Sequence, residues 1–401
     1  MPKPPVVLSL EQALSMSYAT LRFVHLGYRV IRIEQTPVPG RRSRGDPNRR
    51  IGRPVAGSDR HSYFVAANAG KEAIAIDLKR PEGRELLHRL VQELPADVFC
   101  TNTMPARHTE LGVDAATLQA LRPELIWACI SAMGLDHPDV PGYDPVLQAH
   151  CGFMDLTGDA DGPPMQCGPP LIDLKAGDEA FTQVLLAMLE RHRTGRGKVV
   201  DISMARAAVS WLHTFLPMLD MDSPPGELRR SGNEHRQFIP VNAYETRDGH
   251  VFLAVGSDAQ WQRLVATGLF ATLARDELAT NEGRRAHRVE LHGEIEAITR
   301  ARSLEEVAAA LERAQVPHAP ITRIEQVMDL PFIRDAALTT VAPDGRVIRL
   351  PPPAAATEHL QALGGQLPFA PDYGEHTRAV LEEAGLDRGE IADLEEQGVV
   401  A

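Results

Sequence analysis

The sequence predicts an α/β protein, with a doubly wound parallel sheet in its larger part and a separate, smaller α+β domain. In the first 200 residues, short apolar runs alternate with longer stretches that carry apolar residues at helical spacing. Parallel strands joined by helices produce this rhythm. Residues 228–325 follow another pattern, in which two adjacent strand-like runs precede several helices. A chain of 401 residues is long enough for two or three domains.

The elements of the large domain follow from the spacing of apolar residues. Short apolar runs bounded by Gly, Pro or charged residues predict strands, and apolar residues three and four apart predict helices. Strands are expected at 5–10, 28–34, 73–78, 96–102, 125–133 and 198–204, and helices at 12–26, 81–94, 114–123, 173–193 and 205–219. Ligands bind beyond the carboxyl ends of strands in such sheets. That edge is expected to carry Glu34, Asn102 and the loop from Gly134 to Tyr143.

The helix over 173–193 is the most regular. Its apolar residues form one stripe, His192 and Arg193 occupy its last turn, and Gly195 follows as a stop.

A change of composition marks the end of this domain. The segment MDSPPGE at 221–227 breaks helices and strands alike. We therefore expect a large domain over 1–200, a linker helix over 201–227 and a small α+β domain over 228–325. The small domain begins with two strands in FIPVNAYETRDGHVFLAVGS, joined at Asp248-Gly249. The tail over 326–401 contains a strand-like VIRLPPP and ends in two helices, at 371–386 and 388–400.

Composition also limits the partners. The chain has 42 basic and 54 acidic side chains, a formal charge of −12. Because a polyanionic partner needs a positive surface, we expect neither nucleic-acid nor anionic-membrane binding. No apolar run is long enough to span a membrane and the start lacks a signal-peptide pattern, so a cytoplasmic location is expected. The four cysteines are widely spaced and are expected to be free thiols.

One carboxylate stands out as a candidate for chemistry. Familiar catalytic and phosphate-binding motifs are absent, and the 15 histidines lack metal-ligand spacing, so no metal is expected. Asp173 lies in GPPLIDLKAGDEAF (168–181), where a Gly-Pro-Pro turn leads into the helix. As an N-cap, it would accept a backbone N–H. Alternatively, the positive helix end keeps a partly buried carboxylate ionised, and such a carboxylate can act as a covalent nucleophile.

Five segments, in order and at matching intervals, resemble the class III CoA-transferases, a family that includes formyl-CoA transferase and carnitine CoA-transferase. The resemblance covers nearly the whole chain. It rests on NAGKEAIAIDLKRPEGRELL (68–87), ADVFCTN (96–102), GYDPVLQAHCGFMDLTG (142–158), PPLIDLKAGDEAF with RHRTGRGKVVDISM (169–181 and 191–204), and GEHT with GLDRGEIADLEEQGVV (374–377 and 385–400).

The resemblance implies a fold and an assembly. It implies a Rossmann-like large domain completed by residues 330–401, with the small domain inserted through two linkers. It also implies two chains interlocked as a dimer. The partner is a second copy of this chain or a related subunit in a heteromer, since some members work as two unlike subunits.

The resemblance also assigns a reaction and a site. It implies that Asp173 is a nucleophile that carries first an acyl group and then CoA, with a CoA thioester as substrate and no tightly bound cofactor. Backbone N–H groups at the helix start or in glycine loops would stabilise the oxyanion. Lys71 and Asn102 resemble CoA contacts, and Tyr143 and Asp144, in a loop facing the aspartate, are also expected among the CoA-binding residues. Structural alternatives remain open. Lys71 would be a solvated lysine in a turn, and Asn102 would form a turn at the strand end. Tyr143 would pack, and Gln148 would be a capping or core amide.

Some positions depart from the formyl-CoA transferase pattern. The early Ala-Gly-Pro stretch reads ALSMS at 13–17, and the arginines expected after Glu34 and near residue 110 are Gln35 and Glu110. Arg107 is expected to compensate. The CoA phosphates would also meet the basic segment RRSRGDPNRR, where guanidinium groups suit phosphate. The candidates are Arg41, Arg42, Arg44, Arg49, Arg50 and Arg53, with a solvated basic loop as the alternative.

Substrate and activity leave alternatives open. The segments around NTMPAR (102–107) and GNEHRQFIP (232–240) resemble a subgroup that uses succinyl-CoA as donor, such as the benzylsuccinate CoA-transferases and their mesaconyl-CoA relatives. Arg236, Arg107 or His235 would then hold the free carboxylate of a dicarboxylic acid. One alternative is an acyl-CoA racemase of the same fold, although racemases carry Gly-His-Asp where this chain has Gly142-Tyr143-Asp144. Another is a CoA-binding subunit without chemistry, for which an intact Asp173 would be unnecessary.

Overall fold

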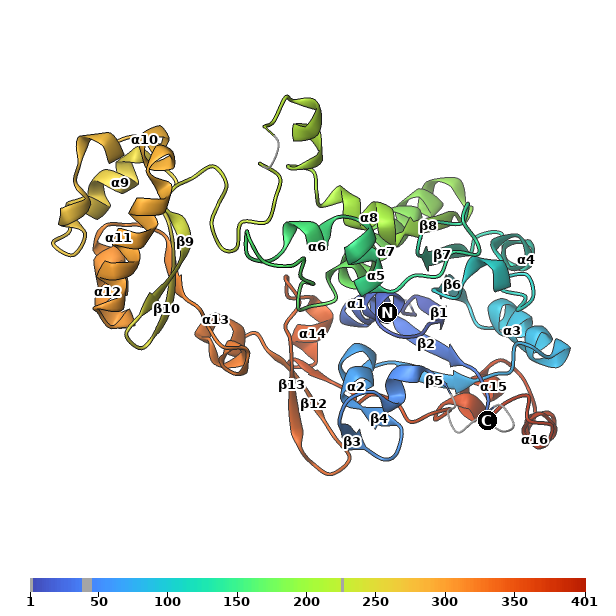
Figure 1. Cartoon of the computed structure of the whole chain (residues 1–401). Coiled ribbons are helices and arrows are strands. Elements are labelled where there is room, and N and C mark those ends of the chain that lie inside the picture. Colours follow the sequence, from blue (N-terminus) through green and yellow to red (C-terminus); the bar gives the residue numbers. More distant parts are fainter. Residues whose placement is uncertain (1–2, 38–44, 225–226) are drawn as a thin grey trace. The chain divides into compact units, whose positions relative to one another are not determined.

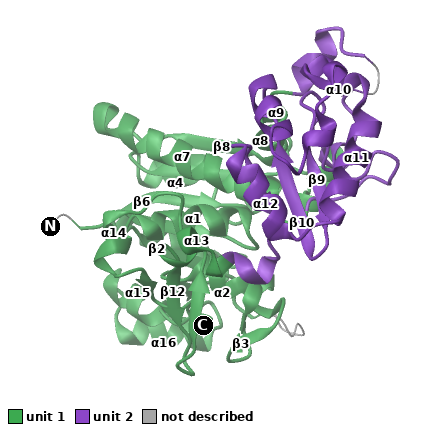
Figure 2. Cartoon of the chain, turned by 90° about the vertical axis from the view of Figure 1, so that its left-hand side faces the viewer, with its two compact units in different colours: residues 1–151, 168–214, 328–401 green, residues 152–167, 215–327 purple. Residues whose placement is uncertain are grey.

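The structure is a computed structural model that describes residues 3–37, 45–224 and 227–401 (Figure 1). The chain divides into two compact units, coloured separately in Figure 2. Unit 1 comprises residues 1–151, 168–214 and 328–401, and unit 2 comprises 152–167 and 215–327. The segment 152–167 thus packs within unit 2, although it lies inside the range 1–200 expected for the large domain.

Unit 1 is built on one parallel sheet of six strands in the order β5-β2-β1-β6-β7-β8, so the predicted parallel α/β fold is confirmed (Figure 1). From β1 the chain moves outward through β2 and β5, then returns beside β1 at β6 and moves outward the other way. The order reverses between β1 and β6, which makes this the switch point of a doubly wound sheet. The strands are β1 Val6–Leu10, β2 Arg29–Glu34, β5 Glu72–Ala75, β6 Ala96–Thr101, β7 Ile126–Ser131 and β8 Val199–Ser203.

Helices cover both faces of this sheet. On one face, Leu8 and its neighbours pack with helices that include α3 Pro81–Glu93, α4 Ala115–Leu121, α15 Thr377–Glu383 and α16 Arg388–Glu396. On the other face, α1 Ser15–His25 packs against α7 Leu171–Thr194, which also contacts β7 and β8. Successive strand residues point to opposite faces, so strands covered twice are mostly apolar on both faces, with the buried charges of β2 as an exception. This explains the continuous apolar runs in the sequence.

Helix α7 begins two residues earlier than expected, at Leu171, and ends where Gly195 takes a left-handed conformation with φ 69°. Because α7 leads into β8, it runs antiparallel to the strands and begins at the carboxyl edge of the sheet. Its second turn touches the start of α1. A Cβ added to Gly177 would lie 2.7 Å from the carbonyl oxygen of Ser15 and 2.9 Å from a ring carbon of Tyr18. Only glycine therefore permits this helix contact.

The expected linker helix is shorter than predicted. Helix α8, Met204–Ser210, ends nine residues before the predicted end at 219, and a short 3₁₀ helix follows at Leu216–Asp220. Pro217 explains part of the difference, since it has no N–H to bond the carbonyl of residue 213. Residues 201–203, placed in the linker by the sequence, belong to β8.

The remaining elements of unit 1 lie around the sheet. The sequence did not predict the small elements between β2 and β5 or helix α5, because they are short. The C-terminal segment returns to unit 1, where Val400 forms a bridge with Ile76 beside β5. These elements are β3 Pro54–Ala56, β4 Arg60–His61, α2 Ser62–Asn68, α5 Asp144–His150, α13 Pro331–Arg334, β12 Leu338–Val341, β13 Val347–Leu350, α14 Glu358–Ala362 and β14 Gln366–Leu367.

Unit 2 has its own core and the predicted α+β character. Its first two strands form the expected hairpin, with Thr246 opposite Gly249 at the turn. A third strand, β11 His318–Pro320, pairs antiparallel with β10, and helices enclose a core around Trp261. Ser303 and Glu306 form a capping box at the start of α12. The other elements are α6 Phe153–Leu156, β9 Val241–Thr246, β10 Gly249–Ala254, α9 Asp258–Val265, α10 Asn281–Ala286, α11 Arg288–Arg300 and α12 Leu304–Arg313.

The tight contact at Gly177 predicts the effect of one methyl group. We expect Gly177→Ala to destabilise the protein by about 1–3 kcal/mol, because the neighbouring backbone oxygen cannot move without separating α1 from α7. Gly293→Ala is the matched control, since Gly293 lies inside α11 and an added Cβ meets nothing within 4 Å. It should gain up to about 1 kcal/mol from helix propensity. Urea unfolding measures the change in stability for each variant. Equal changes for the two substitutions would show that the close contact at Gly177 does not limit the side chain there.

Candidate functional site

Asp173 occupies the third position of α7 rather than its N-cap. The cap position is Pro170, which supplies no side-chain acceptor, and the helix starts at Leu171. The N-cap alternative considered from the sequence is therefore wrong. No hydrogen bond from the protein reaches the Asp173 carboxylate within the described ranges 3–37, 45–224 and 227–401, so its oxygens are free to meet another molecule.

A second carboxylate takes the place of the cap. Asp144, the first residue of α5, accepts the backbone N–H groups of Ile172 at 2.7 Å and Asp173 at 3.1 Å through one oxygen. Its other oxygen accepts the side-chain amide of Gln148 at 2.6 Å. Asp144 and Gln148 are both buried. The structure thus brings Asp144 directly to the start of α7. The sequence analysis had singled out Asp144 and Asp173 but had not predicted the hydrogen bond between them.

Burial raises the pKa of the Asp173 carboxyl to about 7, and the negative charge of Asp144 acts in the same direction. We expected instead that the helix start would keep this carboxylate ionised. Burial and the charge of Asp144 oppose this ionisation, and the helix N–H groups of Ile172 and Asp173 bond Asp144 instead of the Asp173 carboxylate. Asp173 therefore changes its charge near neutral pH.

The start of α7 has no N–H left to serve as an oxyanion donor. The N–H groups of Ile172 and Asp173 bond Asp144, that of Leu171 bonds the carbonyl of Pro169, and that of Leu174 bonds the carbonyl of Pro170. Of the two sources expected from the sequence, this one is excluded. Donors from a glycine-containing loop remain a prediction.

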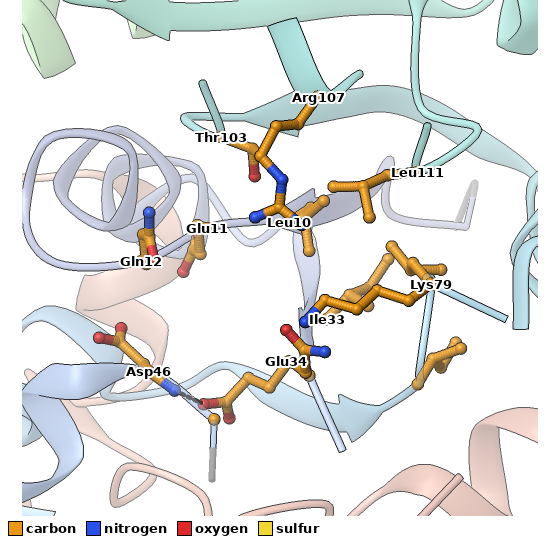
Figure 3. Close-up of a pocket in the computed structure, with 14 residues that line it drawn as sticks. Leu10, Glu11, Gln12, Ile33, Glu34, Asp46, Lys79, Thr103, Arg107 and Leu111 are labelled. Carbon is orange, nitrogen blue, oxygen red and sulfur yellow. Dashed lines mark hydrogen bonds between the residues drawn. The ribbon is translucent and has the colours of Figure 1, made fainter. Parts of the chain in front are cut away.

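A pocket lies at the carboxyl edge of the sheet, at the switch point between β1 and β6 (Figure 3). It has a volume of about 140 Å³ and is lined by residues that follow β1, β2, β5 and β6. The side chains of Arg107 and Lys79 reach into it from opposite sides, as Figure 3 shows. Glu11, Glu34 and Asp46 form much of the remaining polar lining.

The three carboxylates that line this pocket are each paired with a buried cation, and Glu11 pairs with Lys71 at 2.7 Å. Arg32 contacts Glu34 at 3.6 Å and Asp46 at 2.9 Å, and Arg49 contacts Glu34 at 2.6 Å and Asp59 at 3.4 Å. Arg49 also lies over the ring of Phe64. Buried charges are tolerated when they are paired in this way. The sequence analysis missed Arg32 and Asp46, although charged residues inside the apolar strand RVIRIE were a signal.

Arg49 therefore departs from both expectations for the basic segment. Its side chain is buried and bound by carboxylates, so it neither belongs to a solvated loop nor is free for phosphate. Arg53 is exposed and Arg50 half-buried. Arg41, Arg42 and Arg44 lie outside the described residues.

Lys71 is buried as well, which rules out the solvated turn lysine. Its ammonium donates to Glu11 at 2.7 Å, to the carbonyl of Ser17 at 2.8 Å and to Asn68 at 3.1 Å. Burial lowers the pKa of Lys71 to about 8, while the charge of Glu11 opposes this shift. Lys71 thus joins strand β1 to helix α1, and contact with CoA would require it to exchange one of these partners.

Asn102 and Tyr143 occupy different surroundings. Asn102 accepts the N–H of Gln12 at 3.0 Å and donates to its carbonyl at 2.7 Å, so it ties the end of β6 to the loop after β1. The alternative expected from the sequence was a local turn at the strand end, whereas these bonds reach a residue 90 positions away. Tyr143 is 72% exposed and therefore does not pack inside unit 1. A contact of either side chain with CoA remains a prediction.

Fold and site together define an α/β protein with a pocket at the switch point and a titratable carboxylate at the same edge of its sheet. A model of CoA-transferase family III matches residues 5–377. The chain therefore belongs to CoA-transferase family III, as the sequence resemblance implied, and is an enzyme that transfers CoA.

Similar proteins agree with this assignment. Succinate–glutarate CoA-transferase from Agrobacterium fabrum is 32% identical over 401 residues, covering 95% of this chain and 96% of the relative. Succinyl-CoA:mesaconate CoA-transferase from Haloarcula marismortui is 31% identical over 402 residues, covering 96% of each chain. The crystal structure of a CaiB/BaiF family protein from Brucella suis matches with a TM-score of 0.80 at 27% identity, covering 95% of this chain and 98% of that one.

The described residues contain no group of side chains able to hold a metal ion and no helix long and apolar enough to cross a membrane.

The raised pKa of Asp173 predicts a pH-dependent stability. The folded protein holds this proton up to about pH 7, whereas the unfolded chain loses it near 3.8. Between these values the folded state binds more protons, so this group's contribution to stability falls as pH rises. We expect Asp173→Asn to be more stable than the parent by about 2–4 kcal/mol at pH 8.

The difference in stability between Asp173→Asn and its parent should shrink as the pH falls from about 7 to 3.8, and it should be smallest below about pH 4. Urea unfolding of both proteins at several pH values measures it. An Asp173→Asn protein that is less stable at pH 8 than its parent would contradict the raised pKa.

Proposed function

We propose that this enzyme moves CoA from succinyl-CoA to another dicarboxylic acid, with Asp173 as the covalent carrier. The observation that carries the proposal is a half-buried carboxylate that receives no hydrogen bond from the residues the structure describes, at the carboxyl edge of the sheet in the fold of this transferase family. The relatives named for succinyl-CoA and for glutarate or mesaconate support the class of donor and acceptor.

A carboxylate suits this reaction because its acyl products are as reactive as a thioester. An Asp173 oxygen attacks the thioester carbonyl, the carbon–sulfur bond breaks, and a mixed anhydride and CoA thiolate result. The thiolate then attacks the Asp173 carbonyl of the anhydride, releasing succinate and leaving an aspartyl-CoA thioester. The acceptor carboxylate repeats these two steps in reverse order and leaves as its CoA thioester, which restores Asp173. Each exchange becomes a sequence of easier steps.

The free carboxylate of Asp173 is the reactive form, and its pKa of about 7 leaves roughly half of the enzyme ready at neutral pH. A poorly solvated carboxylate also attacks more readily than one surrounded by water. The same surroundings that make this charge costly therefore favour its role as a nucleophile.

Two cations are proposed to receive the phosphates of CoA at the switch-point pocket. Arg107 and Lys79 reach into it, and Arg107 has only a loose contact with Glu110, at 3.7 Å. Its guanidinium can therefore turn to a phosphate. This supports the sequence-based expectation that Arg107 compensates for the missing arginine near residue 110. Asn102, Tyr143 and Arg42 remain candidate CoA contacts.

The acceptor and the assembly are proposed more broadly. An aromatic succinate such as benzylsuccinate belongs with glutarate and mesaconate among the acceptors to be tested, since all are dicarboxylic acids. Arg236 and His235 of unit 2 are the side chains proposed to bind the free carboxylate, and Arg236 already donates to the carbonyl of Arg229. We also propose that the enzyme works as an interlocked dimer, of two copies or with a related subunit.

Removing the nucleophile is expected to abolish transfer. Asp173→Asn should lower kcat by a factor on the order of 10³ or more, because no other group can carry the acyl chain. Asp178→Asn is the matched control, since Asp178 lies on the same helix and pairs with Arg22. It should keep activity within about twofold, as expected for a partly exposed ion pair.

Covalent trapping distinguishes the candidate activities. With succinyl-CoA and hydroxylamine, peptide mass spectrometry should find a hydroxamate on Asp173 in the parent protein and none in Asp173→Asn. Proton exchange at the α-carbon of an acyl-CoA without any adduct would point to racemisation instead. Neither adduct nor exchange would point to a CoA-binding subunit without chemistry.

An acceptor series tests the proposed substrate class. With succinyl-CoA as donor, kcat/KM should be higher for glutarate, mesaconate and benzylsuccinate than for butyrate, which lacks the second carboxylate. Chromatographic detection of each CoA product measures this directly. Faster transfer to butyrate than to all three diacids would contradict a site built for dicarboxylic acids.

A further inference from the structure

We propose that Asp144 is a positioning residue for the transfer reaction: its buried carboxylate holds the first turn of α7 and sets the place and electrostatic surroundings of the Asp173 side chain. The inference rests on the proposed role of Asp173 as nucleophile. It replaces the sequence-based expectation that Asp144 belongs to the CoA-binding residues.

The geometry shows why Asp144 is not available to substrate. Only 2% of this residue is exposed, and its carboxylate receives three donors: the N–H groups of Ile172 and Asp173 and the amide of Gln148. A substrate could reach these oxygens only by displacing backbone groups from the helix start. Asp144 therefore acts through Asp173 and not by touching CoA.

The cap is supplied from outside the helix because α7 cannot supply its own. Pro170 occupies the cap position without a side-chain acceptor, so the first N–H groups need a partner from elsewhere. The bond from the N–H of Asp173 to Asp144 also fixes the backbone of the residue that carries the nucleophile. In contrast, Asp114 caps α4 from the same chain segment, accepting the N–H of Thr117 at 2.9 Å.

The charge of Asp144 gives this cap a second effect. Free Asp173 is an anion beside an anion, whereas the anhydride and the thioester of Asp173 are uncharged. Repulsion from Asp144 is therefore present in the free enzyme and relieved when Asp173 is acylated. This favours formation of the covalent intermediates relative to the free carboxylate, as expected for a like charge that destabilises the starting state.

Other charged or titratable groups near this turn are paired or exposed. Lys175 on α7 pairs with Glu179, and its ammonium lies 5.7 Å from the ring centre of Trp211. On α1, Arg22 pairs with Asp178, and Tyr18 beside it is uncharged at neutral pH. His150 on α5 and Arg206 on α8 are exposed. Asp144 is the group whose charge bears on Asp173.

The test uses Asp144→Asn, which has the same shape and can still accept the helix N–H groups through its amide oxygen while Gln148 turns its own amide. We expect the rising limb of the kcat/KM–pH profile to move at least about one unit toward acid, since the neighbouring charge is gone. At pH 8, the amount of hydroxylamine-trapped Asp173 should fall several-fold. Asp114→Asn, the matched control at an ordinary cap, should change neither.

A measurement without substrate separates this inference from the proposed function. The pH dependence of the stability gained by Asp173→Asn is measured in the parent and again in the Asp144→Asn protein. A midpoint that moves toward acid in the second background supports the coupling, whether or not the enzyme transfers CoA. If the midpoint and the kinetic profile both stay in place, or if Asp144→Asn changes only KM for CoA thioesters, the positioning role is overturned.

The two proposals can thus fail independently. Coupling between the two carboxylates together with full activity of Asp173→Asn would refute the nucleophile and keep the electrostatic link. If Asp173→Asn is inactive but the midpoint of the stability difference is the same in the parent and Asp144→Asn backgrounds, the nucleophile is kept and the electrostatic link is refuted.

Discussion

The two hydrogen bonds from the start of α7 to the Asp144 carboxylate are the constraint on which the candidate site depends. A helix that begins after two prolines has no cap of its own, so its first N–H groups must find an acceptor elsewhere. Asp144 supplies it from a separate helix and brings a negative charge to within reach of Asp173. The same bond thus orders the helix start and makes Asp173 harder to ionise.

A second set of buried charges shapes the other part of this edge. Three carboxylates line the switch-point pocket, and each forms an ion pair with a buried cation. The pairs are Glu11 with Lys71, Glu34 with Arg49 and Asp46 with Arg32. Because paired carboxylates repel a phosphate less than free ones, Arg107 and Lys79 can still attract an anionic ligand. The carboxylates at this edge of the sheet therefore have opposite surroundings. Those that line the pocket are paired with cations, whereas Asp173 lies beside a like charge.

Much of the fold could be predicted from local sequence, because strands covered on both faces are mostly apolar along their length. The runs in β1, β6 and β7 show this directly. Asp173 was found through the residues around it and the family resemblance. The environment of Asp173 could not be predicted, because the bond between Asp173 and Asp144 joins residues 29 positions apart. The burial of Lys71 was hidden for the same reason, because its partner Glu11 is 60 positions away.

The outermost strand, β8, has a further consequence for how the protein behaves in solution. None of the described strands pairs with its free edge, where Val199 is exposed. Such an edge invites unwanted strand addition and aggregation. Exposed Lys198 and Asp201 lie on either side of Val199, and a charged side chain at an edge discourages this pairing. Replacing Lys198 with an apolar residue would remove one of these charges from the edge and make the purified enzyme prone to precipitate.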